Sequence, residues 1–357
     1  MNNFYQFKNK KVIITGHTWF KGSWLLSWML KNNAKILGIS KDIPSNPSHF
    51  KLIKKLKRNK FIDKRININN KKKLEKTIIN FSPDFIFHLA AQSIVTKSVK
   101  NPELTWNSNL FGTMNILEIS RKIKKKCVII LVTSDKCYEN FEISKGYKEN
   151  DRLGGEDPYS ASKASIEILF SSYYRTYLKY NKYIRIATAR AGNVIGGGDW
   201  SNNRIIPDCI RAWQKNKKVI IRNPNSTRPW QHVLEPLRGY MELALKLNKN
   251  KYLNGNAFNF GPKPNYSTKK VIEVVKIIKK YLPDFKWKLK NSSKIKEQRL
   301  LSLNCRKAKL FLKWETILSS NESISFTIDW YNMYYSKKES NTFNQINLYE
   351  KKLKQKN

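Results

Sequence analysis

The sequence has little of what a membrane protein or a disulfide-stabilised protein needs. No uninterrupted apolar run approaches the roughly 20 residues that cross a bilayer. The N-terminal residues Met1 to Tyr5 lack the charged and apolar regions of an export signal. The 357 residues include only four cysteines, with no Cys-x-x-Cys pair and no regular spacing. We therefore expect a cytoplasmic protein with free thiols, without a metal site and without a membrane partner.

Acidic residues are also scarce. Asp and Glu total 26 against 69 Lys and Arg, which gives a formal net charge of +43. The excess is mostly Lys, is spread along the whole chain and accompanies heavy use of Asn and Ile, as A/T-rich coding produces. A dedicated nucleic-acid binder more often gathers its charge on one face with aromatic residues between. Nucleic acid is therefore not the expected partner, whereas the charge would attract anionic substrates such as nucleotide sugars.

The first half of the chain alternates short apolar strands with helical stretches, which is typical of a parallel α/β sheet. The predicted strands are residues 11–14, 35–39, 61–68, 85–89, 128–133 and 183–189. The predicted helices are residues 23–30, 105–122 and 159–177. This order predicts a Rossmann-like, doubly wound sheet that binds ligands at the carboxyl ends of its strands.

The pattern changes after Arg190, where turn-rich segments separate short helices and strands. We predict a nucleotide-binding domain over residues 1–192 and a smaller mixed α/β substrate lobe over residues 193–336. The lobe is expected to interleave with the sheet through residues 257–260. The polar Lys- and Asn-rich tail, residues 337–357, is expected to be disordered or loosely helical. We find no internal repeat.

Two residues of the predicted helix 159–177 suggest a catalytic base. Tyr159 and Lys163 are four residues apart and so share one helix face. An ammonium group beside a phenol favours the phenolate and lowers the tyrosine pKa from its usual value of about 10. Tyr159 is therefore a candidate base for a hydroxyl proton, although this spacing alone occurs by chance in a Lys-rich chain.

The strand 128–133 would deliver Ser134, Asp135 and Lys136 beside that tyrosine. A carbohydrate hydroxyl could be oxidised there if a hydride acceptor lay close by. The alternative interpretation of Asp135 and Lys136 is an ordinary surface ion pair.

A glycine-containing turn joins the first strand to the first helix, where a dinucleotide-binding fold places the pyrophosphate. Gly16 and Gly22 fit the first and last glycines of the fingerprint, but its middle position is Trp19. The tryptophan could block a cofactor, reshape the loop or stack over the ligand. An ordinary strand-to-helix turn is the alternative.

Further dinucleotide features follow along the chain. Asp42 lies about 20 residues beyond Gly22, where a ribose-binding carboxylate is expected, and we favour NAD without a 2′-phosphate. Small residues after the fourth strand, among them Ala90 and Ala91, would allow close approach of a cofactor, and ordinary tight packing of strand and loop is the alternative. Asn109 interrupts a predicted helix, either at a kink that positions its side chain or at a tight packing contact.

Several longer motifs carry a family resemblance. They are GHT (16–18), FKGSWL (20–25), TSDKCYEN (133–140), RAGNVIGGGDW (190–200) and RPWQHVLEP (228–236). In these motifs the chain resembles the extended short-chain dehydrogenase/reductases, and within them the CDP-glucose 4,6-dehydratases, from about residue 10 to residue 331. The resemblance implies an NAD-dependent lyase of deoxysugar and polysaccharide biosynthesis that converts CDP-D-glucose to CDP-4-dehydro-6-deoxy-D-glucose. It also implies a homodimer.

The resemblance assigns roles to the candidate residues. Tyr159 would take the O4 proton of the sugar, Lys163 would hold the cofactor ribose and Ser134 would bind O4. Asp135 would protonate the hydroxyl that leaves C6, which requires a raised pKa. Lys136 stands where related dehydratases have a glutamate base. The expected NAD contacts are Gly16, Phe20, Lys21, Gly22, Asp42, Asn67, Ala90, Ala91, Gln92, Asn109, Tyr159 and Lys163.

The resemblance also places cationic groups on the substrate. Arg228 and Arg299 are expected at the diphosphate, because guanidinium groups pair with phosphate through two hydrogen bonds. Asn193, Arg204 and Arg222 are expected as further nucleotide contacts.

Two alternatives remain open. A nucleotide-sugar 4-epimerase would share Tyr159 and Lys163 but needs no acid at C6, so Asp135 argues against it. A non-catalytic descendant that binds a nucleotide sugar or nucleic acid is favoured by Trp19 and by the charge. The intact catalytic set argues against that descendant.

Overall fold

A computed structural model describes residues 3–57, 60–221, 223–262, 268–289 and 301–356 of the chain. Its centre is a seven-stranded parallel sheet with the strand order β11-β6-β5-β4-β1-β2-β3. The strands are β1 (Lys11–Thr15), β2 (Lys35–Ser40), β3 (Ile62–Arg65), β4 (Phe85–His88), β5 (Cys127–Val132), β6 (Ile184–Ala191) and β11 (Ala257–Phe260). The order reverses between β1 and β4, so the predicted doubly wound sheet is confirmed.

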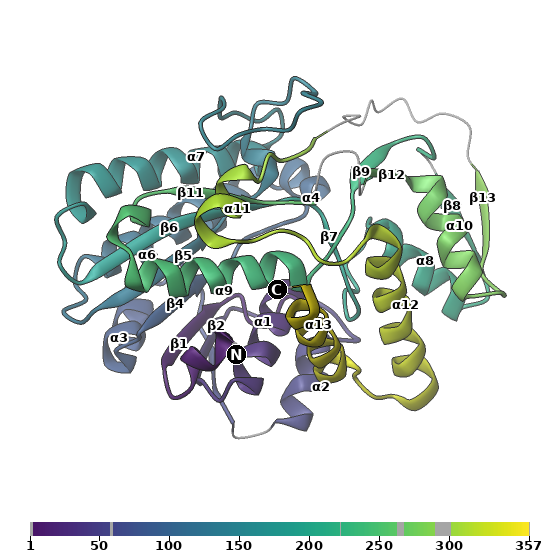
Figure 1. Cartoon of the computed structure of the whole chain (residues 1–357), viewed down its shortest axis with the longest axis horizontal. Coiled ribbons are helices and arrows are strands. Elements are labelled where there is room, and N and C mark those ends of the chain that lie inside the picture. Colours follow the sequence, from purple (N-terminus) through teal and green to yellow (C-terminus); the bar gives the residue numbers. More distant parts are fainter. Residues whose placement is uncertain (1–2, 58–59, 222, 263–267, 290–300, 357) are drawn as a thin grey trace.

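Helices cover both faces of this sheet (Figure 1). In the first part of the chain they are η1 (Asn3–Phe7), α1 (Phe20–Lys31), α2 (His49–Leu56), α3 (Lys71–Phe81), α4 (Val95–Lys100), α5 (Pro102–Trp106), α6 (Gly112–Ser120), η3 (Asp135–Cys137) and α7 (Pro158–Tyr173). Alternate strand residues face opposite sides. Val12 and Ile14 therefore join a core under α1 and the later helix α9 (Leu234–Lys249), whereas Ile13 joins a second core under α3 and α6.

Two of the predicted long helices contain a π-helical turn. The helix expected over residues 105–122 is divided by a π-helical turn, η2 (Asn107–Phe111), that lies between α5 and α6. The helix expected over residues 159–177 becomes π-helical at η4 (Tyr174–Leu178). The third strand is also shorter than the predicted 61–68, because it lies at the edge of the sheet and pairs on one side only.

The second part of the chain lies partly against the large sheet and partly in a smaller lobe at the right of Figure 1. Its elements are β7 (Val194–Ile195), α8 (Ile205–Gln214), β8 (Lys218–Ile221), β9 (Thr227–Pro229), β10 (Gln231–His232), α9 (Leu234–Lys249), η5 (Lys251–Leu253), β12 (Thr268–Lys270), α10 (Val271–Tyr281), β13 (Lys286–Leu289), α11 (Arg306–Leu312), α12 (Ser320–Lys337) and α13 (Thr342–Lys356). The strands outside the large sheet pair as β7 with β10, β8 with β13 and β9 with β12. Strand β11 returns to the large sheet and pairs with β6, and α9 crosses the sheet (Figure 1).

The polar tail corrects one expectation. Instead of being disordered or loosely helical, most of it forms α13, in which Ile346 and Tyr349 are fully buried. Glu350 of this helix accepts hydrogen bonds from Trp28 Nε1 (2.7 Å) and Lys31 Nζ (2.5 Å) of α1. Polar composition concealed an amphipathic helix that buries Ile346 and Tyr349 in the core.

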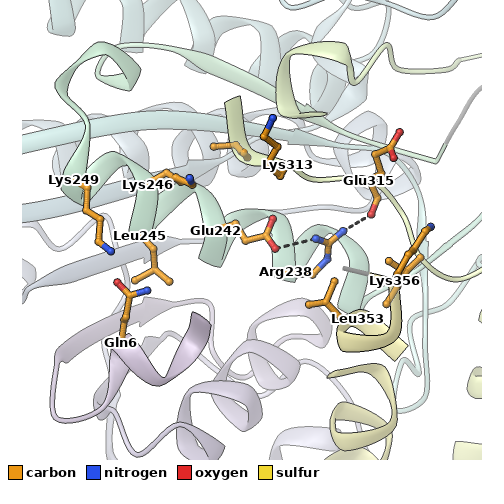
Figure 2. A pocket seen from close by; sticks show the side chains of 12 residues that line it. Gln6, Arg238, Glu242, Leu245, Lys246, Lys249, Lys313, Glu315, Leu353 and Lys356 are labelled. Atoms are coloured by element: carbon orange, nitrogen blue, oxygen red, sulfur yellow. Dashed lines mark hydrogen bonds and ion pairs between the residues drawn. The ribbon is translucent and has the colours of Figure 1, made fainter. Parts of the chain in front are cut away.

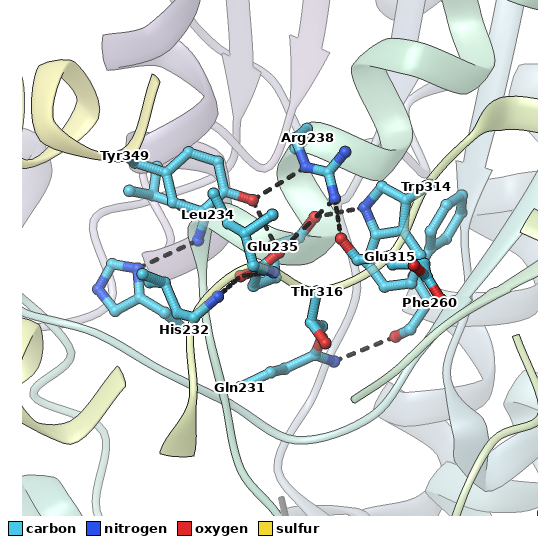
Figure 3. A network of polar contacts seen from close by, with 12 residues as sticks. Gln231, His232, Leu234, Glu235, Arg238, Phe260, Trp314, Glu315, Thr316 and Tyr349 are labelled. Atoms are coloured by element: carbon cyan, nitrogen blue, oxygen red, sulfur yellow. Dashed lines mark hydrogen bonds and ion pairs between the residues drawn. The ribbon is translucent and has the colours of Figure 1, made fainter. Parts of the chain in front are cut away.

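A buried polar network fixes the same helix to α9 (Figure 3). Tyr349 donates a hydrogen bond to Glu235 Oε2 (2.7 Å) and accepts one from Arg238 Nε (3.0 Å). The other oxygen of Glu235 accepts from the backbone N–H groups of Ile317 and Leu318. The network pairs buried charged and polar groups with one another, so removal of one partner leaves another unsatisfied.

Candidate active site

The glycine turn after β1 has the geometry that a dinucleotide-binding loop requires. Gly16 has a φ of +77°, and a Cβ there would lie 2.9 Å from the backbone nitrogen of Ala90. A Cβ on Gly22 would lie 2.1 Å from the carbonyl oxygen of Gly16, so this glycine allows α1 to begin directly against the turn. Both positions therefore exclude a side chain, and the N-terminus of α1 points its free N–H groups at the carboxyl edge of the sheet.

Trp19 occupies the middle of this turn without backbone strain. It is the N-cap residue of α1 with φ −84° and ψ 167°, values that any L-residue adopts. Its N–H donates to the carbonyl of Gly16 at 3.0 Å. Its side chain is partly exposed, and within the described part of the chain the indole has neither a hydrogen bond nor a ring contact. The loop is therefore not distorted by the tryptophan.

A histidine that the sequence analysis passed over supports the loop from below. His17 is fully buried, and its ring lies between Ser40 Oγ at Nδ1 (3.0 Å) and Asp63 Oδ1 at Nε2 (3.0 Å). Burial lowers the pKa of His17 despite the carboxylate. The bond from His17 to Asp63 joins β3 to the loop, and Asp63 also pairs with Lys54 and Arg65. His17 and Asp63 are 46 positions apart in the sequence, so no local pattern could have revealed the pair.

The predicted ribose and adenine contacts lie near the ends of β2 and β3. Asp42 is exposed, and its backbone carbonyl accepts hydrogen bonds from Thr18 Oγ1 (2.6 Å) and Arg65 Nη1 (3.2 Å). Asn67 is also exposed, and its side-chain oxygen accepts from the N–H of Asn69 at 3.1 Å. Both residues thus lie at the same edge of the sheet as the glycine turn. The side-chain oxygen of Asn67 already accepts one hydrogen bond, from Asn69.

Asn109 lies at the π-helical turn and is fully buried. Its Oδ1 accepts from the N–H of Gln92 (2.7 Å), and its Nδ2 donates to the carbonyl of Gln92 (3.0 Å) and to Ser162 Oγ (2.9 Å). The side chain of Gln92 bonds in turn to Thr105 and to the backbone of Ile94. The predicted kink is therefore present, and it ties the loop after β4 to α7.

The residues after β5 form a buried acid. Ser134 Oγ donates to Asp135 Oδ1 at 2.8 Å, and Asp135 is 5% exposed. Burial raises the pKa of Asp135, although Lys136, the Ser134 hydroxyl and Lys21 each oppose that shift. Lys136 is partly buried beside it on the short helix η3. The carboxyl is therefore held toward its neutral form, and the surface ion-pair interpretation of Asp135 is wrong because the carboxyl is buried.

Tyr159 and Lys163 share one face of α7 as predicted, but they do not act on each other as expected. Burial raises the pKa of Tyr159 to about 12, while a hydrogen bond with Ser134 and the charge of Arg204 oppose the shift. Lys163 Nζ instead donates to the carbonyl of Val132 at 3.3 Å. Burial lowers the pKa of Lys163 to about 8. The expected net lowering of the Tyr159 pKa is thus not found, because burial raises it.

Lys21 lies in this cluster as well as in the glycine loop. Burial lowers its pKa to about 8, and the neighbouring charges that act on it are Asp135, Arg204 and Lys163. Its Nζ donates to Tyr240 Oη of α9 at 3.4 Å. A residue expected at the cofactor therefore also feels the charge of Asp135, the expected acid. Phe20 faces the smaller lobe, where a Cβ on Gly196 would lie 3.1 Å from its ring.

The predicted substrate residues are partly accounted for. Arg204, the N-cap residue of α8, pairs with Asp199 at 3.0 Å and acts electrostatically on Tyr159. Asn193 is exposed between β6 and β7. Arg228 lies on β9, where its backbone pairs with Lys269. Arg222 and Arg299 lie outside the described residues.

A cavity lined by described residues lies elsewhere in the molecule. It measures about 390 Å³ and lies between η1, α9, the segment after α11 and the end of α13 (Figure 2). Glu242 and Lys246 of α9 line it, two and six residues beyond Tyr240, so it lies on the opposite face of that helix from Lys21. The cavity is therefore separate from the catalytic cluster.

Two further observations bear on the kind of site this is. Across the described ranges, no group of three or more His, Cys, Asp or Glu side chains is arranged to hold a metal ion. In the same part of the chain, none of the helices combines the length and apolar character needed to cross a membrane.

Comparison with known proteins agrees with this geometry. The family model described as GDP-mannose 4,6 dehydratase matches residues 13–326. The chain belongs to this dehydratase family of the extended short-chain dehydrogenase/reductases. It is 38% identical to the CDP-glucose 4,6-dehydratase of Salmonella typhimurium over 334 residues, which cover 92% of each chain.

Solved structures of the dehydratase family's fold resemble the chain over nearly its whole length. An epimerase, Mth375, from Methanothermobacter thermautotrophicus superposes with a TM-score of 0.79 at 21% identity, covering 94% of this chain and 96% of the other. The dTDP-glucose 4,6-dehydratase of Bacillus anthracis, in complex with NAD, superposes with a TM-score of 0.74 at 21% identity, covering 90% and 96%. At these identities the likeness concerns the fold.

Proposed function

We propose that the protein dehydrates CDP-D-glucose to CDP-4-dehydro-6-deoxy-D-glucose with NAD as its cofactor. The observation that carries the proposal is the buried Ser134–Asp135 pair beside Tyr159 at the carboxyl edge of the sheet. The similarity to the Salmonella typhimurium enzyme supports the choice of substrate. The overall reaction removes one water molecule from the sugar and leaves its oxidation state unchanged.

The residues at the glycine turn fit NAD. A Cβ at Gly16 or Gly22 would fill the space at the turn, and the N-terminus of α1 offers N–H groups to a diphosphate. Asp42 lies where a carboxylate would meet the ribose hydroxyls, and Ala90 and Ala91 leave room beside the turn. When bound, NAD would accept a hydride from C4 and return it to C6. Lys163 would orient the ribose of NAD, and Asn109 would position the loop after β4 beside it.

Each step at the sugar then has a protein group. Tyr159 would take the O4 proton. Ser134, which is hydrogen-bonded to Tyr159, would hold O4 in place. The resulting ketone acidifies the C5 proton, which Lys136 would remove. Asp135 would donate its proton to the hydroxyl that leaves C6, a role that requires the raised pKa that its burial produces.

The same acid separates this proposal from a 4-epimerase. An epimerase removes and returns a hydride at C4 and has no use for a proton donor at C6. Asp135 is buried, bonded to Ser134 and held toward its neutral form, which is a costly arrangement for a residue without a task. We therefore favour dehydration.

The substrate would bind between the carboxyl edge of the large sheet and the smaller lobe. Arg204 and Asn193 would contact the nucleotide from the smaller lobe, with Arg222, Arg228 and Arg299 as further candidates. This division corresponds to a nucleotide-binding domain over residues 1–192, an interleaved substrate lobe over residues 193–336 and the C-terminal segment 337–357.

We further propose a homodimer that forms through the helices around η2 and α7. Val99, Phe111, Ile168 and Tyr177 lie on neighbouring helical segments and are 62%, 47%, 60% and 45% exposed. Apolar side chains on adjacent helices favour burial against a second copy. Free thiols, of which Cys127, Cys137 and Cys209 are buried, fit a location in the cytoplasm.

The test is to incubate the purified protein with CDP-glucose, with and without added NAD, and to identify the sugar by NMR. A 4-keto-6-deoxy product is expected, and dependence on added NAD would indicate weak retention of the cofactor. A CDP-sugar epimerised at C4, or no turnover of CDP-glucose by folded protein that binds NAD, would contradict the proposal.

A further inference from the structure

Glu167 is a buried carboxylate on helix α7 that no step of the proposed reaction uses. It lies four residues after Lys163 and is 3% exposed. Positions four apart share one face of a helix, so Glu167 lies on the turn after Lys163 and also faces the sheet. Both of its oxygens are engaged there, and the three groups that bond to them are all donors.

The three donors to Glu167 come from two neighbouring strands. Thr133, which directly follows β5, donates from Oγ1 to Oε1 at 2.5 Å. Thr188 Oγ1 and Arg190 Nη2 of β6 donate to Oε2 at 2.8 and 2.9 Å. A carboxylate can only accept hydrogen bonds, so its two oxygens match these partners. One side chain therefore joins α7 to the end of β5 and to β6.

Arg190 extends this link to the other side of the segment that contains the proposed acid. The arginine is 4% exposed, its Nη1 donates to Tyr138 Oη at 2.7 Å, and its guanidinium lies 5.0 Å from the centre of the Tyr138 ring. Thr133 directly precedes residues 134–137, and Tyr138 directly follows them. The Glu167–Arg190 pair therefore contacts the chain on both sides of this segment.

Lys163 makes a second and longer attachment one turn earlier on α7. Its Nζ donates to the carbonyl of Val132 at 3.3 Å. Two consecutive residues at the end of β5, Val132 and Thr133, thus contact two consecutive turns of α7. Tyr159 lies one turn further toward the N-terminus, where α7 packs against η3. The height of Tyr159 above the acid segment therefore depends on which turns of α7 meet the end of β5.

We propose that Glu167, paired with Arg190, is a positioning residue that sets the height of α7 and so places Tyr159 against Ser134 and Asp135. Its buried oxygens bond to protein donors, so it acts through Tyr159 and not on the substrate. A misplacement of about 1 Å between reacting groups can cost about 10²-fold in rate, so a helix that carries the base needs such an attachment. This inference rests on the proposed function for its catalytic meaning, but the link between α7 and residues 133–138 can be measured without turnover.

A matched pair of substitutions separates positioning from general stability. Thr133→Val and Thr188→Val each remove one hydroxyl donor from the same carboxylate, at threonines that are 5% and 0% exposed. Only the first substitution breaks the bond that joins α7 to the end of β5. Glu167→Gln weakens the contacts to both strands. Its control is Glu242→Gln, at a glutamate of α9 that pairs with the buried Arg238 at 2.9 Å.

For each variant the measurements are kcat, KM, the kinetic isotope effect of CDP-glucose deuterated at C4, and urea unfolding. We expect Glu167→Gln to lower kcat by about 10²-fold and Thr133→Val by about tenfold, with KM little changed. The isotope effect should rise in both, because the hydride leaves C4 as Tyr159 takes the O4 proton. Thr188→Val and Glu242→Gln should keep the wild-type kcat and isotope effect even where they unfold more easily. Thr133→Val should add little in the Glu167→Gln background.

Backbone hydrogen exchange in substrate-free protein is the readout that needs no turnover. Thr133→Val should raise exchange in α7 and in residues 133–138 together, whereas Thr188→Val should leave residues 133–138 as in wild type. Exchange that rises in neither region overturns the inference, as does an equal loss of kcat in the two threonine variants or a wild-type kcat and isotope effect in Glu167→Gln.

If Glu167→Gln does not fold, the two threonine variants provide the test. Coupled exchange of α7 and residues 133–138 in a protein that does not dehydrate CDP-glucose would support this inference while contradicting the proposed function.

Discussion

Asn109 donates a hydrogen bond from Nδ2 to Ser162 Oγ at 2.9 Å, which joins the loop after β4 to the catalytic helix α7. Ser162 lies between Tyr159 and Lys163 in the sequence, and its hydroxyl donates to the carbonyl of Tyr159 at 2.7 Å. The same asparagine holds both backbone polar groups of Gln92. The edge expected to face NAD and the expected base are therefore positioned by one side chain.

Replacing this asparagine should damage both stability and activity. Asn109→Ala would leave the N–H of Gln92 without its partner in a buried site, which costs about 1–3 kcal/mol. Urea unfolding should register that loss, and kcat should fall more than stability accounts for. The matched control is Asn115→Ala, at a position six residues further along the chain. This variant removes a hydrogen bond from Asn115 to the carbonyl of Ile68 and should leave kcat close to wild type.

The proposed acid can be tested at the elimination step. Asp135→Asn keeps the size of the side chain but has no proton of suitable acidity to give the departing hydroxyl. We expect product formation to fall by about 10²–10⁴-fold, the usual contribution of a general acid, while CDP-glucose still binds. Asp284→Asn, at an exposed surface position, should change neither quantity. Full activity in Asp135→Asn would remove Asp135 from the mechanism.

Acid should destabilise the fold through its histidines. Burial lowers the pKa of His49, His88 and His232 to about 3. The unfolded chain binds these protons near pH 6.5, so the stability is present above that pH and declines as the pH falls. Each such histidine should contribute a loss of about 1.4 kcal/mol per pH unit below 6.5. Urea unfolding between pH 7.5 and 5 should reveal this slope.

A single variant checks the origin of that slope. His49→Gln can keep the contact to Ser23 and Thr342 but cannot take up a proton. Its unfolding free energy should depend less steeply on pH than that of wild type, because unfolding would take up about one proton fewer. An equal slope would assign the acid sensitivity to other groups.

The C-terminal helix should be essential to the fold through the Glu235–Arg238–Tyr349 network. Tyr349→Phe removes the donor to Glu235 and the acceptor of Arg238, both of them buried, and should cost about 1–3 kcal/mol in unfolding free energy. Leu348→Ala changes a largely exposed neighbour and should cost less than 0.5 kcal/mol or so. Equal stability of the two variants would contradict this role for the network.

The contrast between this helix and the large sheet shows which features a sequence reveals. The strands of the sheet were predictable because apolar runs such as 128–133 indicate buried strands. The interruption at Asn109 was predictable because asparagine and glycine weaken a helix. Contacts between distant segments were not predictable. His17 with Asp63, Lys21 with Tyr240 and the docking of Tyr349 depend on which surfaces the fold brings together.

The candidate site was predictable to the same extent. Local spacing placed Tyr159 and Lys163 on one face of α7, and the strand before Ser134 brought it to the same edge. The hydrogen bond of Lys163 to the Val132 carbonyl was not foreseeable, since it depends on the exact height of α7 above β5. The pKa of Tyr159 followed burial rather than its sequence neighbour for the same reason.

Trp19 provides the last test, at the one position where the glycine loop departs from its fingerprint. Its φ of −84° means that glycine is not needed there for backbone conformation, so Trp19→Gly should leave the fold intact. What glycine would change is access, because the bulky indole stands at the N-terminus of α1 where a diphosphate would approach. We expect Trp19→Gly to bind NAD several-fold more tightly by isothermal titration, with Trp19→Phe close to wild type. Weaker binding by Trp19→Gly than by Trp19→Phe would instead mean that an aromatic ring packs on the cofactor, and the substitution would then be an adaptation of the loop rather than an obstruction.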